Sequence, residues 1–385
     1  TGPVALGGFA FDPMGSARRS GPGRPGGATG IWSDFPDAWL AVPRFLLTQA
    51  RDETWLTVNV RLTPGSDPAE EIGAIELDLA DWLAPPGLLD PFERAGEAPD
   101  PTPGLLIEEV EPDRWSARVQ ALARDIRRGK PVKAVLARQV RLQAHRPFTL
   151  SRVLQALLES YPNCSVFAFC RGSSCFVGAT PEWLVRLRER QLYSMALAGS
   201  AARGLTEEDD RHLAQALLQS QKERTEHALV LAAIQEALRD LCETLELPSE
   251  PGLLHLPTLQ HLYTPVTGRI RAGYTVLDVV ERLHPTPAVG GYPREAALQW
   301  LAGHEQLDRG WYAGPVGWID PQGGGEFAVA IRSALVQGRK AWLFAGCGIM
   351  AESDPAREYE ESWLKLQPML RALRQGLPAP EGSGP

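Results

Sequence analysis

Apolar residues recur along this chain at two spacings, and each spacing predicts one kind of element. Trp115, Val119, Leu122 and Ile126 recur every three or four positions, which predicts a helix that ends at Gly129. The same spacing predicts further helices along the chain. They cover residues 150–160, 207–220, 222–245, 276–283, 293–301 and 355–373.

Alternation of apolar and polar residues predicts the strands. Residues 55–62 alternate throughout, which predicts a half-buried antiparallel strand. Other strands are predicted at residues 5–12, 132–142, 165–171, 174–178, 183–187, 191–197, 259–270, 314–319, 327–336 and 341–345. Hairpins and helices are interspersed without a regular strand–helix–strand repeat. The pattern therefore predicts an α/β fold of the α+β kind, with large, mostly antiparallel sheets faced by helices.

Breaks in this pattern divide the chain into three parts. Residues 16–30 are rich in Gly, Arg and Pro and predict a mobile loop, whereas residues 84–104 hold six prolines and predict a linker. The predicted parts are a strand-rich N-terminal portion with this linker, a larger domain and a frayed tail, at residues 1–104, 105–375 and 376–385. Because the first residue is Thr1 and a strand follows at residue 5, we expect the N-terminal portion to be truncated from a longer parent chain.

Charge and composition narrow the class of protein. The 385 residues are 44% hydrophobic and 22% charged, as in soluble globular proteins. The net charge of -8, without a long basic block, disfavours nucleic acid as a partner, and no apolar run is long enough to span a membrane. The five cysteines form no CxxC pair, so we expect reduced thiols in the cytoplasm. They are Cys164, Cys170, Cys175, Cys242 and Cys347.

The last predicted helix and the strand before it form a candidate binding site. Ser-Asp-Pro at residues 353–355 is typical of a helix start. Glu358, Glu361 and Lys365 then share one helix face. The strand ends in Gly-Cys-Gly at residues 346–348, where bare backbone can approach a ligand closely. This combination suits an anionic ligand held partly through a divalent cation, and the alternative is a solvated charged face.

Two residues have the character of a general base and a general acid. Lys133 begins an otherwise apolar strand, where lost hydration lowers the pKa of an ammonium group. The alternative is a lysine that reaches out to solvent from the strand end. Glu182 follows a strand in a rigid Thr-Pro-Glu turn, and a shielded carboxyl there can stay protonated. The alternative is a solvated surface glutamate.

Four further motifs add weaker signals. Glu226, near the start of a long predicted helix, either faces inward as a metal ligand or pairs with Arg224 or His227. Gly199 lies in a loop of small residues that permits close approach of a ligand. Arg332 lies in a strand of small and apolar residues, so its guanidinium needs a carboxylate from the protein or from a ligand. A glycine-rich turn before residue 314 carries the hydroxyl of a tyrosine, Tyr312.

Taken in order, these motifs resemble the chorismate-utilising enzymes. They are joined by the stretch LHPTPAVGG at residues 283–291, and the resemblance covers roughly residues 113–373. The family comprises isochorismate synthases, salicylate synthases, anthranilate synthase component I and aminodeoxychorismate synthases. Membership implies an anthranilate synthase component I-like chorismate-binding fold, with catalysis in the domain at 105–375.

Within the family the chain resembles the isochorismate synthases. Lys133 stands where ammonia-using members usually carry glutamine, and LHPTPAVGG is the form typical of isochorismate synthases. The resemblance implies Mg²⁺-dependent conversion of chorismate to isochorismate by a monomeric enzyme. Salicylate synthase, an ammonia-using anthranilate or aminodeoxychorismate synthase, and a non-catalytic chorismate-binding relative stay open as alternatives. Menaquinone, a siderophore and salicylate stay open as the destination of the product, with menaquinone favoured on general grounds.

The resemblance also implies a role for each candidate residue. Lys133 resembles the base that activates water for attack at ring C2, and Glu182 the acid that protonates the departing C4 hydroxyl. The implied Mg²⁺ ligands are Glu226, Glu358 and Glu361. Tyr312 and Arg332 resemble a clamp on the enolpyruvyl carboxylate. Further carboxylate contacts are implied for Gly199, Gly346 and Lys365.

Overall fold

The computed structural model describes residues 2–12, 30–50, 53–83, 105–109, 112–129 and 131–377. Nearly all of the predicted loop at 16–30, the linker at 84–104 and most of the tail at 376–385 lie outside the described residues. Within the described part of the chain, no helix combines the length and the apolar character needed to cross a lipid bilayer.

The described residues form two large sheets and one two-stranded sheet, and the largest has nine strands with every pairing antiparallel. Its order is β11-β13-β10-β9-β16-β15-β1-β2, with β12 also paired to β13. The strands are β1 (Ala5–Phe9), β2 (Ala38–Ala41), β9 (Trp183–Arg188), β10 (Gln191–Ala202), β11 (Cys242–Glu246), β12 (Gly252–His255), β13 (Leu259–Ile270), β15 (Pro315–Ile319) and β16 (Gly325–Val329). Strands from both ends of the chain therefore share this sheet, and β1 lies directly beside β15.

The second sheet has seven strands in the order β14-β6-β18-β17-β8-β7, with β5 also paired to β6. They are β5 (Leu105–Glu109), β6 (Lys133–Ala144), β7 (Ser165–Arg171), β8 (Ser174–Thr180), β14 (Gly291–Tyr292), β17 (Ser333–Gln337) and β18 (Lys340–Ile349). The long pair β6–β18 runs through its centre, from Lys340 opposite Gln143 to Ile349 opposite Ala134. A separate hairpin consists of β3 (Phe45–Ala50) and β4 (Glu53–Val58).

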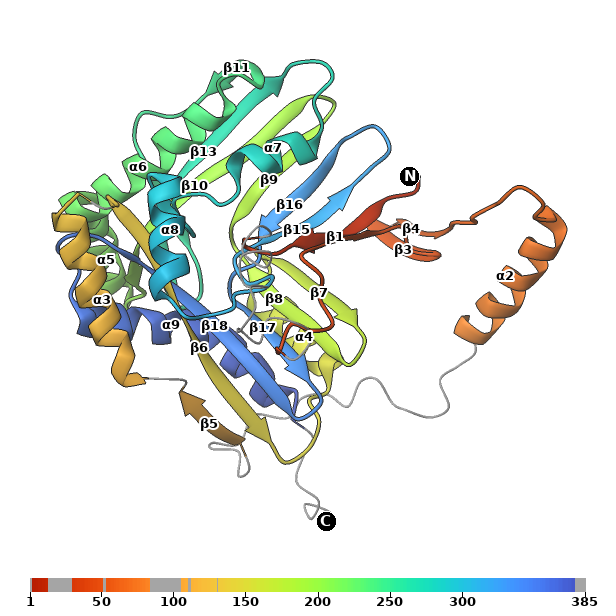
Figure 1. Cartoon of the computed structure of the whole chain (residues 1–385), viewed down its shortest axis with the longest axis horizontal. Coiled ribbons are helices and arrows are strands. Elements are labelled where there is room, and N and C mark those ends of the chain that lie inside the picture. Colours follow the sequence, from red (N-terminus) through yellow and green to blue (C-terminus); the bar gives the residue numbers. More distant parts are fainter. Residues whose placement is uncertain are drawn as a thin grey trace.

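Helices cover the outer faces of the two sheets (Figure 1). α5 (Glu207–Gln219), α6 (Gln221–Leu238) and α7 (Val276–Leu283) pack against the nine-stranded sheet. α3 (Pro112–Arg127), α4 (Leu150–Ser160), α8 (Arg294–His304) and α9 (Pro355–Gln375) pack against the seven-stranded sheet. α2 (Pro68–Leu83) stands away from this body beside the β3–β4 hairpin (Figure 1).

The main hydrophobic core joins the two sheets. Phe176 on β8 and Phe344 on β18 meet Phe327 on β16 in one buried cluster, which extends to α3, α6, α7 and α8. A smaller cluster lies between the seven-stranded sheet and the helices α4 and α9. This arrangement confirms the predicted fold class, in which large antiparallel sheets are faced by helices. The predicted boundary at residue 105 stays a prediction.

Two predicted elements end or break where a distant strand competes. The helix predicted at 222–245 ends at Leu238, because the residues from Cys242 pair with β13 as β11. The strand predicted at 327–336 is two strands in different sheets, β16 and β17. Between them the chain crosses from one sheet to the other, with Arg332 in a left-handed conformation of φ 51°.

Two other expectations were wrong. The antiparallel strand predicted at 55–62 exists as β4, but it ends at Val58 and is not half-buried, since Leu56 is 38% exposed and β3 is its one strand partner among the described residues. The expectation of reduced thiols fails for Cys170 and Cys175, which form a disulfide. The β7–β8 hairpin places these two residues opposite each other, a pairing that spacing along the sequence does not reveal.

Candidate active site

Lys133 and Glu226 form a buried ion pair at the start of β6. The Lys133 side chain is fully buried, and its Nζ lies 2.8 Å from Oε1 of Glu226 on α6. Gly348 makes room for the pair, because a Cβ there would lie 2.5 Å from the same Oε1 and 2.9 Å from Cε of Lys133. Although burial opposes ionisation of Glu226, the charge of Lys133 holds the pKa of this carboxyl below its usual value. Glu226 thus pairs with Lys133, and not with Arg224 or His227, the partners considered as the alternative to a metal site.

A buried arginine fixes the backbone around Lys133. Arg309 donates to the carbonyl of Val135 on β6 at 2.6 Å and to that of Val289 at 2.9 Å. Glu305 balances its charge, with Oε2 at 2.8 Å from Nε, and accepts from the amide of Ala137 through Oε1 at 2.7 Å. Arg309 thus holds β6 and the stretch 283–291 in fixed positions relative to each other, which the sequence alone did not predict.

Glu182 is a buried carboxyl at the end of β8. Its amide donates to Oγ1 of Thr180 at 3.2 Å, and its carbonyl accepts from Val329 on β16 at 3.0 Å, so both sheets fix the turn. Burial raises the pKa of Glu182 to about 7, although the charges of Arg332, Lys133 and Lys365 oppose this shift. The carboxyl can therefore carry a proton near neutral pH, and the solvated alternative is wrong.

One pocket brings Glu182 together with Glu226. Gly199, Arg332 and Lys365 also line it. Lys133 lies just behind this lining, where Gly348 and Glu226 separate it from the cavity. The amine and the acid are thus at one site, contributed by β6 and by the end of β8.

The positively charged wall of the pocket is formed by Arg332 and Lys365. Arg332 is buried, and among the described residues no carboxylate forms an ion pair with it. Lys365 Nζ donates to the carbonyl of Gly346 at 2.9 Å and lies 2.6 Å from Oε1 of Glu361. Tyr312 lies beside them, and a Cβ at Gly346 would come within 3.1 Å of its hydroxyl. A buried guanidinium without a protein carboxylate fits a ligand that supplies one.

Gly199 lies at a bulge in β10, with φ of 80°. The bulge turns the amide of Ser200 to Oε2 of Glu223 at 3.2 Å, and Ser200 Oγ lies 2.9 Å from Nδ1 of His261 on β13. Burial, together with the charges of Arg332 and Lys365, lowers the pKa of His261 to about 3. A neutral imidazole therefore lines the pocket at neutral pH.

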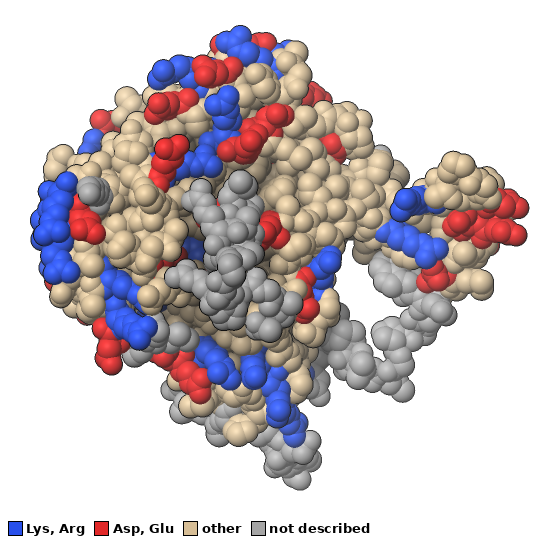
Figure 2. All heavy atoms as spheres, viewed as in Figure 1, with Lys and Arg blue, Asp and Glu red and all other residues tan. Residues whose placement is uncertain are grey.

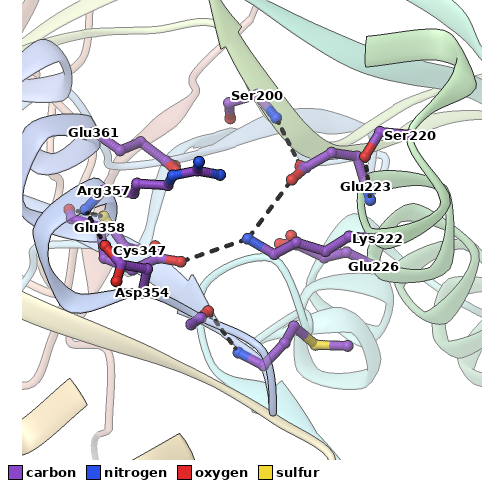
Figure 3. A network of polar contacts seen from close by, with 12 residues as sticks. Ser200, Ser220, Lys222, Glu223, Glu226, Cys347, Asp354, Arg357, Glu358 and Glu361 are labelled. Carbon is purple, nitrogen blue, oxygen red and sulfur yellow. Dashed lines mark hydrogen bonds and ion pairs between the residues drawn. The ribbon is translucent and has the colours of Figure 1, made fainter. Parts of the chain in front are cut away.

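Carboxylates from two helices gather at the other wall of the pocket (Figure 3). Glu223 and Glu226 come from α6, and Glu358 and Glu361 from α9. Burial and the charge of Glu361 raise the pKa of Glu358 to about 7, and burial and the charge of Glu226 raise the pKa of Glu223. The ammonium of Lys222 lies between the two groups.

This cluster fits a hard divalent cation. Carboxylate oxygens are the ligands that Mg²⁺ prefers, and burial together with neighbouring negative charge raises the pKa of both Glu223 and Glu358. The Sγ of Cys347 lies within 4.8 Å of ligand atoms of Glu358 and Glu361, but it donates to the backbone carbonyl of Glu358 at 3.2 Å. A thiol is too soft to be a preferred magnesium ligand. The carboxylates, and not the thiol, therefore make this cluster suitable for Mg²⁺.

Eight of the ten predicted site residues line this pocket. The other two are Lys133, which lies behind Glu226 and Gly348, and Glu358, which contacts Lys222. Sequence reasoning missed Lys222, Glu223, His261 and Arg309. For Glu223 a signal existed, because it precedes Glu226 by three residues and so shares its helix face. For His261 and Arg309 there was none, since their partners are distant in the sequence.

Comparison with known proteins now places the chain in a family. Residues 1–374 match the chorismate binding enzyme family. The chain is a chorismate-binding enzyme. The predicted resemblance to chorismate-utilising enzymes is thereby confirmed.

Relatives of this chorismate-binding enzyme include two isochorismate synthases. "Isochorismate synthase MenF" of Bacillus subtilis is 38% identical over 372 residues, which cover 97% of this chain and 75% of the relative. "Salicylate biosynthesis isochorismate synthase" of Pseudomonas aeruginosa is 40% identical over 377 residues, with the same two coverages of 97% and 75%.

Solved structures share the fold of this chorismate-binding enzyme. MenF, the menaquinone-specific isochorismate synthase from Escherichia coli, superimposes with a TM-score of 0.79 at 26% identity, covering 96% of this chain and 78% of that one. Anthranilate synthase component I from Streptococcus pneumoniae has a TM-score of 0.76 at 22% identity, covering 95% and 80%. The predicted anthranilate synthase component I-like fold is confirmed.

Proposed function

We propose that this protein is an isochorismate synthase, which converts chorismate to isochorismate. The observation that carries the proposal is a buried, protonatable carboxyl, Glu182, at the pocket that Lys133 adjoins. Curated relatives with this activity match 97% of the chain at 38% and 40% identity, and they support the same reaction here. The expected monomeric state and cytoplasmic location stay predictions.

The two groups divide the proton transfers between them. Lys133 is the proposed base for the water that attacks ring C2. The C4 hydroxyl departs as water after Glu182 has donated its proton. One water enters and one leaves, so the substrate and product are isomers. Transfer of one proton from Lys133 to Glu182 then restores both groups for the next turnover.

Substrate binding depends on the two walls of the pocket. Arg332 and Tyr312 are suited to one carboxylate, because a buried guanidinium and a phenol hydroxyl can both donate to it. Lys365 and the backbone at Gly199 and Gly346 would contribute further donors or room for the ligand. The carboxylates Glu226, Glu358 and Glu361 would hold Mg²⁺, which neutralises the second carboxylate of the substrate.

Product analysis tests the proposal. Chorismate is incubated with the purified protein, with and without Mg²⁺, and the products are separated by chromatography. We expect isochorismate, only when Mg²⁺ is present. Salicylate with pyruvate would identify a salicylate synthase, and an aminated product formed with ammonium would identify an ammonia-using synthase. Unchanged chorismate under every condition would refute the enzyme assignment.

A further inference from the structure

The proposed function leaves Lys222 without a role, although this residue occupies the centre of the carboxylate cluster. Lys222 is the second residue of α6, and its Nζ lies 3.7 Å from Oε1 of Glu223 on the same helix. The same Nζ lies 3.6 Å from Oε1 of Glu358 on α9. The side chain therefore bridges α6 and α9, as Figure 3 shows. These two helices pack against different sheets.

The bridge is suited to opening. Both contacts are longer than a hydrogen bond, and the Lys222 side chain is 39% exposed, whereas that of Glu358 is 4% exposed. Four carboxylates gather at this point, from Glu223 and Glu226 on α6 and from Glu358 and Glu361 on α9, and Lys222 Nζ lies within 4 Å of two of them. The carboxylates thus need a cation near this point, while the lysine itself can leave toward solvent.

We propose that Lys222 is a tethered cation, which holds the carboxylates of α6 and α9 together in the metal-free enzyme and is displaced when the divalent ion binds. The inference rests on the metal site of the proposed function. A direct consequence is competition within the molecule, since the ion must remove an ammonium before the carboxylates become available. The metal-free enzyme in turn keeps its two helices at their spacing without an ion.

Removal of the lysine charge tests this competition. For Lys222→Met we expect Mg²⁺, titrated calorimetrically without substrate, to bind about three- to tenfold more tightly, as the loss of one or two weak ion pairs predicts. In EDTA the melting temperature of the variant should fall below that of the wild type, because the carboxylates then repel one another without a cation. Saturating Mg²⁺ should remove this difference.

Arg224→Met is the matched control. Arg224 lies two residues further along α6 and is 38% exposed, but it pairs with Glu250 at 2.7 Å. Its loss changes the net charge of the protein by the same amount, so a general field effect would tighten Mg²⁺ binding equally in both variants. We expect the control to keep the wild-type affinity within about twofold, as its half-exposed ion pair predicts. Equal tightening would overturn the proposal, as would an unchanged or weaker affinity of Lys222→Met.

Displacement can also be followed in the wild-type protein, which removes any concern about folding of a variant. Acetylation of Lys222 by acetic anhydride, quantified by mass spectrometry, should accelerate on addition of Mg²⁺. The exposed Lys340 serves as the internal reference. An unchanged rate would overturn the proposal. If the wild type binds no Mg²⁺ at all, the metal site of the proposed function fails instead, so the two failures are distinguishable.

Discussion

At the scale of single residues, burial sets the chemistry of this site. Glu182 is an ordinary carboxyl by sequence, and it becomes suited to act as an acid because burial raises its pKa to about 7. His261 responds to the same burial in the opposite direction, and it loses its charge. Burial thus favours the neutral form of both groups. The neutral form of Glu182 can donate a proton, whereas the neutral form of His261 is an uncharged imidazole.

Replacement of Glu182 by glutamine tests whether the buried carboxyl acts as the general acid. Glu182→Gln should lower kcat by about 10²–10⁴-fold, the usual contribution of a general acid. Wild-type kcat/KM should fall as the pH rises through the Glu182 pKa of about 7, and the variant should lack this limb. A pH–rate series on both proteins measures the effect. An unchanged alkaline limb in the variant would assign it to another group.

The same substitution should stabilise the protein in alkaline solution. The pKa of Glu182 is about 7 in the folded protein and 4.5 as an ordinary value, so the folded state holds a proton that the unfolded state has lost between these pH values. Its contribution to stability therefore falls as the pH rises through this window. At pH 8 Glu182→Gln should gain about 1–3 kcal/mol of unfolding free energy over the wild type, as urea titration can measure. At pH 4 the difference should vanish.

Lys133 should be needed for turnover but not for binding. Lys133→Ala should lose about 10²–10⁴-fold in kcat, since it removes the proposed base, while chorismate affinity stays nearly constant. Lys133→Gln is the companion variant, because an amide can still donate to Glu226 and avoids leaving that carboxylate unpaired. Calorimetric binding and product chromatography separate the two effects. Turnover at the wild-type rate in either variant would exclude the proposed base.

At the scale of elements, the glycines of β18 allow the buried ion pair to form. Gly346 and Gly348 line the pocket, whereas Cys347 between them points away and donates to α9. β18 is hydrogen-bonded to β6 along its whole length, so it cannot shift to admit a larger side chain. The space for the Lys133–Glu226 pair therefore depends on a missing Cβ at Gly348.

Gly348→Ala should separate the pair without unfolding the sheet. The new Cβ would meet Glu226 Oε1 at 2.5 Å and Lys133 Cε at 2.9 Å, closer than real contacts allow. We expect activity to fall at least about 100-fold, because small displacements of reacting groups cost this much. Gly252→Ala on β12 is the control, since its Cβ has no neighbour closer than 3.8 Å. Equal activity of the two variants would contradict the role assigned to Gly348.

Local patterning predicted those elements whose partners are near in sequence. The bounds of α4, α7 and β13 agree with the pattern, because the apolar stripe and the turn residues specify each of them. The end of α6 at Leu238 and the break at 330–332 could not be read in this way. In both places a strand far away in the sequence decides the conformation.

Those site residues that belong to short sequence motifs could be predicted. Glu182, Lys365 and the carboxylates of α9 follow from local sequence and from the family resemblance. The pairing of Lys133 with Glu226 does not, since 93 residues separate them (226 − 133) and only the packing of α6 over the sheets joins them. Arg309 was not predicted for the same reason, because its acceptors lie on β6 and in the stretch 283–291, which are distant in the sequence.

At the scale of the whole molecule, the carboxylate cluster joins the two layered halves. α6 packs on the nine-stranded sheet and α9 on the seven-stranded sheet, and their glutamates face each other across the pocket. Figure 2 shows acidic and basic side chains interspersed over the face of the molecule in view. Although the net charge is -8, the pocket lining includes the basic side chains of Lys222, Arg309, Arg332 and Lys365, which favour an anionic ligand.

Magnesium should stabilise the entire fold through this junction. At 100 times its Kd, an ion that binds only the folded state adds about 2.7 kcal/mol, which corresponds to a rise of about 4 °C in melting temperature. Glu361→Gln should reduce this rise, whereas Glu360→Gln, an exposed neighbour on α9, should not. Differential scanning fluorimetry in EDTA and in Mg²⁺ measures it. An equal rise in all three proteins would place the ion elsewhere.

The crossing at 330–332 has a consequence for inhibitor design. Arg332 lies where the chain passes from one sheet to the other. A molecule bound by this guanidinium and, through the proposed Mg²⁺, by the glutamates of α6 and α9 would therefore be attached to both sheets at once. An inhibitor whose two acidic groups match the spacing of these two binding positions would link the sheets without moving them. A compound whose acidic groups are too far apart would have to wedge the sheets open, and it would lose packing energy in the shared core for each contact it gained.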